Sequence, residues 1–159
     1  MKNNKPLDGI KVIEISTIIT ASLSAMMLAD QGAEVIKIEQ TGFGDPLRYL
    51  GTQKGGVSAI FANVNRGKSS LELDLKKDTD LNSAKKLICE ADVLINNFRP
   101  GVMEALGLSK AECKKINKNL IYVAITGFGK EGPFSNSPAY DHVVQAMSGA
   151  TAIQSDGDK

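Results

Sequence analysis

The chain has 159 residues, of which 42% are apolar and 23% are charged, with 19 Lys and Arg against 18 Asp and Glu. This length fits one ordinary domain with one core, and this composition excludes a disordered or fibrous chain. The net charge of +1 argues against a general nucleic-acid binder, which carries a concentrated basic excess, so any anionic ligand must be held by local groups.

Cysteine and histidine are too scarce for a metal site. Cys89, Cys113 and the single histidine, His142, leave no credible set of zinc ligands, so we expect no metal and two inert free thiols. The polar N-terminus leads straight into a strand pattern, and the longest apolar stretch, IITASLSAMMLA, is too short and too interrupted to span a bilayer. We therefore expect a cytoplasmic protein that binds neither membranes nor nucleic acid.

The first part of the chain predicts a strand, a helix and a second strand. KVIEIS (11–16) is a short β-branched run, and the apolar residues after it have helical spacing that stops at Gly32. EVIKIE (34–39) alternates apolar and charged residues, which is typical of a strand. The periodic pattern breaks down between 40 and 68. The segment QTGFGDPLRYLGTQKGG (40–56) is rich in glycine, and we interpret it as a long loop, which in a compact domain usually has a function.

The pattern returns with a third strand at SSLELDL (69–75), again alternating. Asp78 is a candidate cap for a helix over 79–91. DVLINNF (92–98) then supplies the next apolar strand. A strand, helix and strand thus follow one another.

The last part predicts short helices around one more strand. Helical stretches occupy 101–119, and Ser109 with Glu112 three positions on has the spacing of a capping box. LIYVAITG (120–127) is the last clear strand, and a final helix begins near Tyr140. The chain then stops in polar residues without a closing element, so we expect it to be part of a longer protein.

Strands that alternate with helices predict parallel pairing with right-handed crossovers. The predicted fold class is α/β, with a Rossmann-like open, mainly parallel sheet that has helices on both faces. We expect residues 1–159 to form a single domain.

Polar side chains follow two of the predicted strands. Asn97 and Arg99 follow one strand and Lys76 follows another, and ligands of open parallel sheets gather beyond the carboxyl ends of strands. A guanidinium beside the first N–H groups of a helix would receive a phosphate, and Asn97 could hold a ribose hydroxyl or an amide. The alternative is that Asn96 and Asn97 satisfy loop backbone groups while Arg99 and Lys76 point into water.

Two other segments carry weaker signals. TGFGKEGP (126–133) has neither the arrangement of a dinucleotide fingerprint nor a Walker lysine. Asp141 stands at or near the start of the last helix, as a cap stabilised by the helix dipole or as an acid or base facing the crevice. A serine-histidine-carboxylate triad is discounted, because no nucleophile elbow is present and His142 directly follows Asp141.

Six segments, in order, resemble the N-terminal portion of the class III CoA-transferases, the family of formyl-CoA transferase, carnitine CoA-transferase and alpha-methylacyl-CoA racemase. The resemblance extends from about Pro6 to Gly149 and rests on PLDGIKVIEIS, MLADQGAEVIKIEQTGFGDPLR, NRGKSSLELDLK, INNFRPGVMEALGL, NLIYVAITGFGKEGP and AYDHVVQAMSG. It implies a Rossmann-like domain whose crevice binds coenzyme A, and a homodimer of interlocked chains. The substrates implied are an acyl-CoA and a carboxylic acid.

The resemblance also implies site residues. Phe98 and its neighbours line the site for the nucleotide and diphosphate, and the end of the LDLK strand flanks the adenine and its phosphates. The implied coenzyme A contacts are Ile19, Thr20, Gln40, Leu73, Asp74, Leu75, Lys76, Asn97, Phe98, Arg99 and Tyr140.

Three of these positions depart from the family pattern. Gln40 takes a place where relatives often carry a basic residue, so one phosphate contact is expected to be weaker. Ile19 and Thr20 fall where relatives often show an alanine-glycine-proline turn near the thioester. The geometry around the acyl group is therefore expected to differ.

The resemblance places the catalytic aspartate of the transferases after the helix near Tyr140. That aspartate attacks the acyl-CoA carbonyl to give a mixed anhydride. We expect this chain to stop before it and to show no turnover alone. Asp141 matches the acid/base aspartate of the racemase branch, but the racemase needs a histidine upstream and His142 lies downstream.

The leading interpretation is the coenzyme A-binding N-terminal part of an acyl-CoA:carboxylate CoA-transferase. The alternatives are a noncatalytic coenzyme A-binding module or half of a split enzyme, with a racemase-type isomerase less favoured.

Overall fold

A computed structural model describes residues 5–154 of the chain. The chain divides into two compact units, Met1–Ile125 and Thr126–Lys159. The larger unit contains the sheet and the helices that cover it. The predicted site residues up to Arg99 all lie in this unit, whereas Tyr140 and Asp141 lie in the smaller one.

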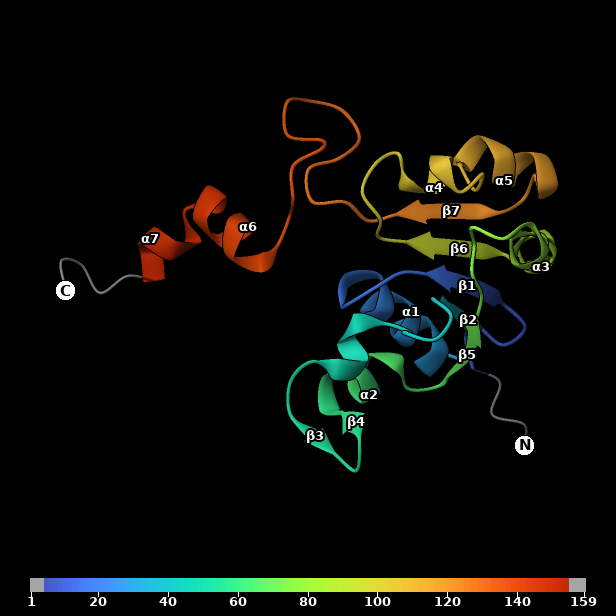
Figure 1. The fold of residues 1–159 in the computed structure, drawn as a ribbon, viewed down its shortest axis with the longest axis horizontal. Helices are drawn as coiled ribbons and strands as arrows, with labels where there is room; N and C mark the ends of the chain where they lie inside the picture. Colours follow the sequence, from blue (N-terminus) through green and yellow to red (C-terminus); the bar gives the residue numbers. More distant parts are fainter. Residues whose placement is uncertain (1–4, 155–159) are drawn as a thin grey trace. The chain divides into compact units, whose positions relative to one another are not determined.

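A five-stranded, fully parallel sheet forms the centre of the first unit (Figure 1). The strand order is β5-β2-β1-β6-β7. The bounds are Lys11–Ile15 for β1, Glu34–Glu39 for β2, Lys68–Glu72 for β5, Val93–Asn96 for β6 and Ile121–Ala124 for β7. From β1 the chain adds β2 and then β5 on one side of the sheet. It then adds β6 and β7 on the other side of β1. The reversal between β1 and β6 is the topological switch point, where open α/β sheets bind ligands.

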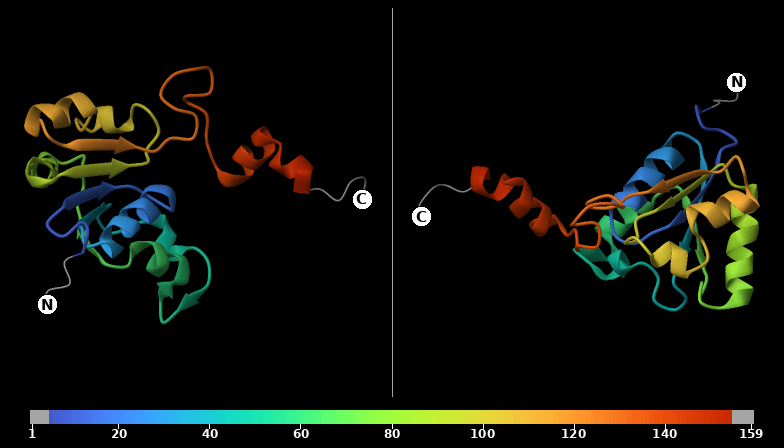
Figure 2. Two further views of the ribbon diagram at one scale, coloured as in Figure 1. Left: turned by 180° about the vertical axis from the view of Figure 1, so that it is seen from behind. Right: turned by 90° about the horizontal axis from the view of Figure 1, so that it is seen from above.

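Helices cover both faces of this sheet, as predicted (Figure 2). One core packs Val12 and Val35 of the strands against Ala21 and Ala25 of a helix. The other core packs alternate strand residues, including Ile13, against the helices of the opposite face. The helix on the first face is α1, Thr20–Asp30, and those on the second are α3, Asp78–Glu90, α4, Val102–Ala105, and α5, Lys110–Ile116. The central strand β1 is therefore buried on both faces from Val12 to Ile15.

The helix ends follow the local sequence signals. Ser109 caps α5, because its hydroxyl accepts the Glu112 N–H at 3.2 Å. The Glu112 carboxylate accepts a bond from the Ser109 hydroxyl and not from the Ser109 N–H, so the predicted capping box is half formed. Asp78 is the first residue of α3 and not its cap. It lies in the first turn, where a carboxylate interacts favourably with the positive end of the helix dipole.

The long loop predicted over 40–56 is wrong, because four short elements lie between residues 40 and 68 and the first two of them fall within 40–56. Asp45 accepts the Leu47 N–H at 2.9 Å and starts a 3-10 helix, and Ser58 accepts the Phe61 N–H at 3.2 Å and starts α2. The elements are η1 Pro46–Tyr49, β3 Gln53–Lys54, β4 Val57–Ser58 and α2 Ala59–Asn65. Each is too short to show a periodic apolar pattern.

The second unit contains a loop and two helices, α6 (Asp141–Ser148) and α7 (Ala150–Gln154). The predicted start of the last helix is confirmed, with Tyr140 in the position just before it. The Tyr140 ring stacks on His142, with ring centroids 6.1 Å apart. Gly149, at φ 78°, ends α6 in the left-handed conformation that glycine favours.

Both cysteines are free thiols, as predicted. Cys113 is buried, and burial raises the pKa of its thiol to about 11. Because the thiolate is the reactive form, this thiol is inert at neutral pH. Within residues 5–154, every helix is too short or too polar to cross a lipid bilayer.

Core packing around the central strands predicts a large cost for truncating Leu94. This side chain on β6 is 0% exposed, so Leu94→Ala is expected to lower the free energy of unfolding by about 2–5 kcal/mol. Met27 on α1 is 54% exposed, and Met27→Ala should change it by about 0.5 kcal/mol or less. Urea unfolding measures both, and equal losses would contradict this packing.

Candidate functional site

A cavity of about 590 Å³ opens at the carboxyl ends of β1, β2, β5 and β6. It therefore lies at the switch point of the sheet, where such folds bind ligands. Its wall is made of Ile15, Ser16, Thr17, Ile38, Glu39, Gln40, Thr41, Phe43, Gly44, Asp45, Pro46, Leu73, Asp74, Leu75, Lys76, Phe98, Val102, Ala105 and Leu106.

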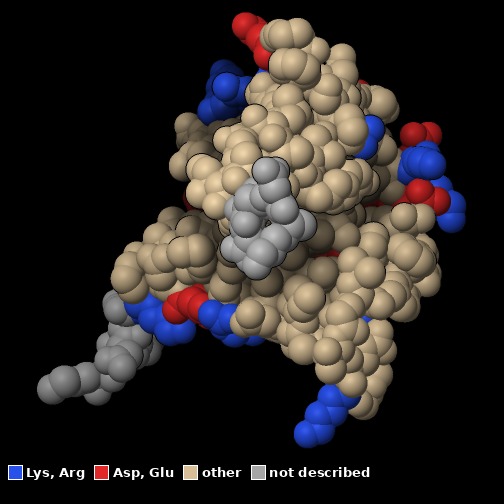
Figure 3. Space-filling model, turned by 90° about the vertical axis from the view of Figure 1, so that its left-hand side faces the viewer, with Lys and Arg blue, Asp and Glu red and all other residues tan. Residues whose placement is uncertain are grey.

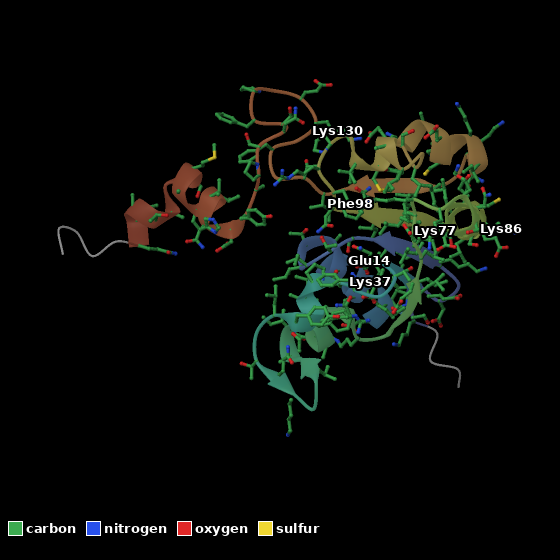
Figure 4. The ribbon with its side chains drawn as sticks, in the orientation of Figure 1. Glu14, Lys37, Lys77, Lys86, Phe98 and Lys130 are labelled. Carbon is green, nitrogen blue, oxygen red and sulfur yellow. The ribbon has the colours of Figure 1, made fainter. Side chains whose placement is uncertain are left out.

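Six of the predicted contact residues line this cavity. Lys76 follows β5 and Phe98 follows β6, so the cavity joins two strand ends that are distant in sequence. Figure 4 shows Phe98 at the carboxyl end of β6. The six are Gln40, Leu73, Asp74, Leu75, Lys76 and Phe98.

The remaining predicted residues of the first unit do not line the cavity. Arg99 is exposed and directly follows Phe98, and Ile19 and Thr20 form the start of α1. Thr20 accepts a hydrogen bond from the Asn97 side chain at 3.0 Å. The sequence predicts that Lys76 and Arg99 share one ligand at this edge of the sheet. In the structure Lys76 lines the cavity, and Arg99 directly follows Phe98, which lines it as well.

The two asparagines at the end of β6, Asn96 in its last position and Asn97 directly after it, bind the protein backbone. Asn97 accepts the Thr17 N–H at 3.1 Å and donates to the Thr17 carbonyl at 2.7 Å. Asn96 donates to the Val123 carbonyl of β7 at 3.2 Å. The structure thus follows the alternative in which these amides satisfy backbone groups. Asn97 clamps the turn after β1, which is the turn that borders the cavity.

The helix start after Arg99 is not an open anion site. The helix α4 has four residues, and the Glu104 carboxylate already accepts the Gly101 N–H at 3.1 Å. A carboxylate at this place repels a phosphate. Recognition of an anion near β6 therefore depends on side-chain cations and not on this helix end.

Asp141 and Tyr140 belong to the second unit. Asp141 is the first residue of α6, and its carboxylate accepts a hydrogen bond from Gln145 one turn along the helix. Tyr140 is 63% exposed. The roles that the resemblance implies for these two residues stay predictions.

Sequence reasoning missed a buried cluster of four charges behind the cavity. Glu14 on β1 accepts hydrogen bonds from Lys37 on β2 at 2.6 Å and from Lys68 on β5 at 2.7 Å. Lys37 also pairs with Asp45 at 2.9 Å. All four side chains are at most 2% exposed, and two acids balance two bases. Figure 4 shows Glu14 and Lys37 on their neighbouring strands.

The signal for this cluster was present in the sequence. Glu14 and Lys37 stand opposite each other in the register of β1 and β2. Alternation of apolar and charged residues suggests a strand with one wet face, but a central strand of a covered parallel sheet has no wet face. Opposite charges on such strands indicate a buried ion pair.

A second ion pair connects β2 to the segment after it. Glu39 binds Arg48 through two parallel hydrogen bonds, at 2.8 Å to Nε and 2.7 Å to Nη2. It also accepts bonds from the Ser70 hydroxyl and the Asp45 N–H at 2.6 and 2.8 Å. The Arg48 guanidinium lies 3.9 Å from the centre of the Phe61 ring, a cation–π contact. Glu39 thus fixes the 3-10 helix η1 on the edge of the sheet.

These contacts shift the pKa of the buried groups. Burial alone would raise the pKa of Glu39, but its four hydrogen bonds outweigh burial and lower it to about 2. Burial opposes ionisation of Glu14 as well, yet Lys37 and Lys68 lower its pKa. Burial lowers the pKa of Lys68 more than Glu14 raises it.

The turn between β1 and α1 has an unusual backbone. Ile18 has φ 65°, which is rare for a β-branched residue and costs free energy. The Ile18 N–H donates to the Asp45 carboxylate at 3.0 Å. With Asn97 bound to Thr17 on the other side, two side chains from distant segments hold this turn.

Figure 3 shows one face of the molecule, and the Lys, Arg, Asp and Glu side chains drawn on this face lie mainly along its margins. Among residues 5–154, no group of three or more His, Cys, Asp and Glu side chains is arranged to hold a metal ion.

The sequence matches the model of CoA-transferase family III over residues 7–159. The chain belongs to CoA-transferase family III. It is 45% identical over 148 residues to the acetyl-CoA:oxalate CoA-transferase of Acetobacter aceti, and 37% identical over 154 residues to the succinyl-CoA:glutarate CoA-transferase of Homo sapiens. These matches cover 93% and 96% of the chain but 38% and 35% of the relatives, so the chain spans little more than a third of their length.

Two solved structures share this fold. A CAIB/BAIF family protein from Brucella suis aligns with a TM-score of 0.92 at 37% identity, over 99% of this chain and 43% of its own. Rv3272 from M. tuberculosis aligns with a TM-score of 0.89 at 36% identity, over 97% and 43%. The predicted family and the predicted α/β fold are both confirmed.

The low pKa of Glu39 predicts an acid-dependent loss of stability. Its folded pKa of about 2 is below the ordinary value of 4.5, so its contribution is full above pH 4.5 and is lost as the pH falls towards 2. Glu39→Gln should unfold more easily at pH 7 and lose less stability between those pH values than the parent. Urea unfolding across this range measures both slopes, and parallel curves for the two proteins would contradict the assignment.

Proposed function

We propose that residues 1–125 form the coenzyme A-binding crevice of an acyl-CoA:carboxylate CoA-transferase. The observation that carries the proposal is the cavity at the switch point, in a chain of CoA-transferase family III. The relatives at 45% and 37% identity are named for transfer between an acyl-CoA and a dicarboxylate, oxalate or glutarate. Acyl-CoA and a carboxylic acid are therefore the proposed substrates.

The cavity wall offers groups suited to the charged phosphates of coenzyme A and to its less polar adenine and pantetheine parts. Lys76 supplies an ammonium group for the phosphates, and Arg99, directly after Phe98, is assigned to the same diphosphate through charge-assisted hydrogen bonds. Ile15, Leu73 and Phe98 give apolar surface for the adenine ring and the pantetheine arm. These walls lie at the ends of separate strands, which suits an extended ligand.

Asp74 lies in the same wall, but its carboxylate repels the coenzyme A phosphates only weakly. Its carboxylate accepts the Lys76 N–H at 3.2 Å and lies 3.7 Å from the Lys77 ammonium. Its Oδ1 and Oδ2 therefore both face donors of its own turn. In this proposal Asp74 shapes the strand end, and Lys76 makes the phosphate contact.

The proposal assigns binding and orientation of coenzyme A to this chain's residues. Covalent attack by the family's aspartate, as the resemblance implies, would release the coenzyme A thiolate and leave a mixed anhydride. The homodimer, the cytoplasmic location and the roles of Asp141 and Tyr140 stay predictions.

Calorimetric titration with coenzyme A tests the proposal. Lys76→Ala and Arg99→Ala should each weaken binding by about 10–100-fold, the value of a lost charge-assisted hydrogen bond. Lys118→Ala is the matched control, since Lys118 is exposed, lies three residues before the amino end of β7 at Ile121, and does not line the cavity. Its affinity should equal that of the parent.

Two outcomes would count against this function. No heat of binding for the parent protein would remove the crevice as a coenzyme A site. An equal loss of affinity in Lys118→Ala would show that the net charge of the protein, and not a contact in the cavity, determines binding. In an assay with acetyl-CoA or succinyl-CoA and a dicarboxylate acceptor, binding without acyl transfer is the expected result for residues 1–159 alone, and acyl transfer by them would contradict it.

A further inference from the structure

We infer that Asp45 is a positioning residue that fixes two walls of the cavity in binding geometry before the ligand arrives. The inference rests on the proposed function, since the ligand concerned is coenzyme A. Asp45 lines the cavity but is 1% exposed, so its carboxylate faces the protein interior. Asp45 therefore acts on the cavity through the protein groups that it binds.

The carboxylate of Asp45 connects three segments. Its Oδ1 accepts the Ile18 N–H at 3.0 Å and the Leu47 N–H at 2.9 Å, so one oxygen holds both the turn after β1 and the start of η1. Its Oδ2 has the Lys37 ammonium at 2.9 Å and no hydrogen bond of good geometry. The positive charge of Lys37 thus holds the Asp45 carboxylate in place from the β2 side.

The turn that Asp45 holds does not keep its shape on its own. Ile18 has φ 65°, and a β-branched residue leaves that region unless the surroundings hold it. Thr17, the preceding residue, lines the cavity, as do Phe43 and Gly44 in the segment before Asp45. Loss of the Asp45 contacts would release both walls together.

The Asp45 backbone is anchored as firmly as its side chain. Its N–H donates to Glu39 at 2.8 Å, and Glu39 is the last residue of β2. The segment 40–45 therefore leaves the sheet at Glu39 and returns to it at Asp45. Phe43 is carried on this closed loop, with its carbonyl bound by the Tyr49 hydroxyl at 3.0 Å. A loop tied at both ends presents its cavity side in one arrangement, which reduces the ordering needed on binding.

The test uses Asp45→Asn, which keeps the shape and one acceptor oxygen but removes the charge that pairs with Lys37. Coenzyme A affinity by calorimetry is expected to fall about tenfold or more, because the buried ion pair with Lys37 is lost and the walls loosen. Leu120→Ala is the control for stability alone. Leu120 is fully buried just before the amino end of β7, at the other end of the strands from the cavity. It should lower the unfolding midpoint and leave the affinity of the folded protein within about twofold of the parent.

A double variant separates positioning from simple loss of a contact. Glycine adopts positive φ at little cost, so Ile18→Gly removes the strain that Asp45 restrains. The effect of Asp45→Asn on affinity is expected to be smaller in the Ile18→Gly background than in the parent. Equal effects in both backgrounds would show that Asp45 and Ile18 act independently and would overturn the inference.

Hydrogen exchange of the ligand-free protein supplies a readout that does not need coenzyme A. Asp45→Asn should speed exchange at both 16–19 and 43–48, and Leu120→Ala should not single out these segments. If the parent fails to bind coenzyme A, the proposed function fails, and exchange alone decides whether Asp45 couples the two walls. Unchanged exchange at either segment would overturn the inference.

Discussion

The buried Lys37 ammonium, held between the carboxylates of Glu14 and Asp45, is the interaction on which the site depends. Charges taken out of water are costly unless they are paired and hydrogen-bonded, and here Lys68 completes a balanced set of four. The cluster joins β1, β2 and β5 to the segment that follows β2. A cluster of this kind specifies one arrangement of these segments, because each alternative leaves a charge unpaired.

The cavity follows from this arrangement. Parallel strands place their carboxyl ends at one edge, and the reversal of strand order between β1 and β6 leaves a crevice there. The ion pairs of Glu39 and Asp45 then fold the segment after β2 over that edge as one wall. Asn97 clamps the turn after β1 as another. The residues that shape the site are thus mostly buried, and the cations assigned to the phosphates, Lys76 and Arg99, are exposed.

Much of the fold could be predicted from local pattern, since strands and long helices repeat over enough residues to show their period. The bounds of β2 were predicted as observed, and parallel pairing predicted that the segments after β5 and β6 meet at one edge of the sheet, where Lys76 and Phe98 line one cavity. The elements within 40–68 were missed because each is set by one cap or tertiary contact. The charge cluster was missed because burial of Lys37 depends on helices that cover the sheet. The amide of Asn97 was open to two interpretations, and only the position of Thr17 decides between them.

The most direct test of the account is the set of backbone amide signals that move when coenzyme A is titrated into the isotope-labelled protein. The account predicts that the moving signals cluster at the carboxyl ends of the strands, at 15–17, 40–45, 73–76 and 98–99. Signals at the amino ends, such as those of Lys11 and Lys118, should stay in place. Shifts centred on the amino ends, or none at saturating coenzyme A, would contradict the account.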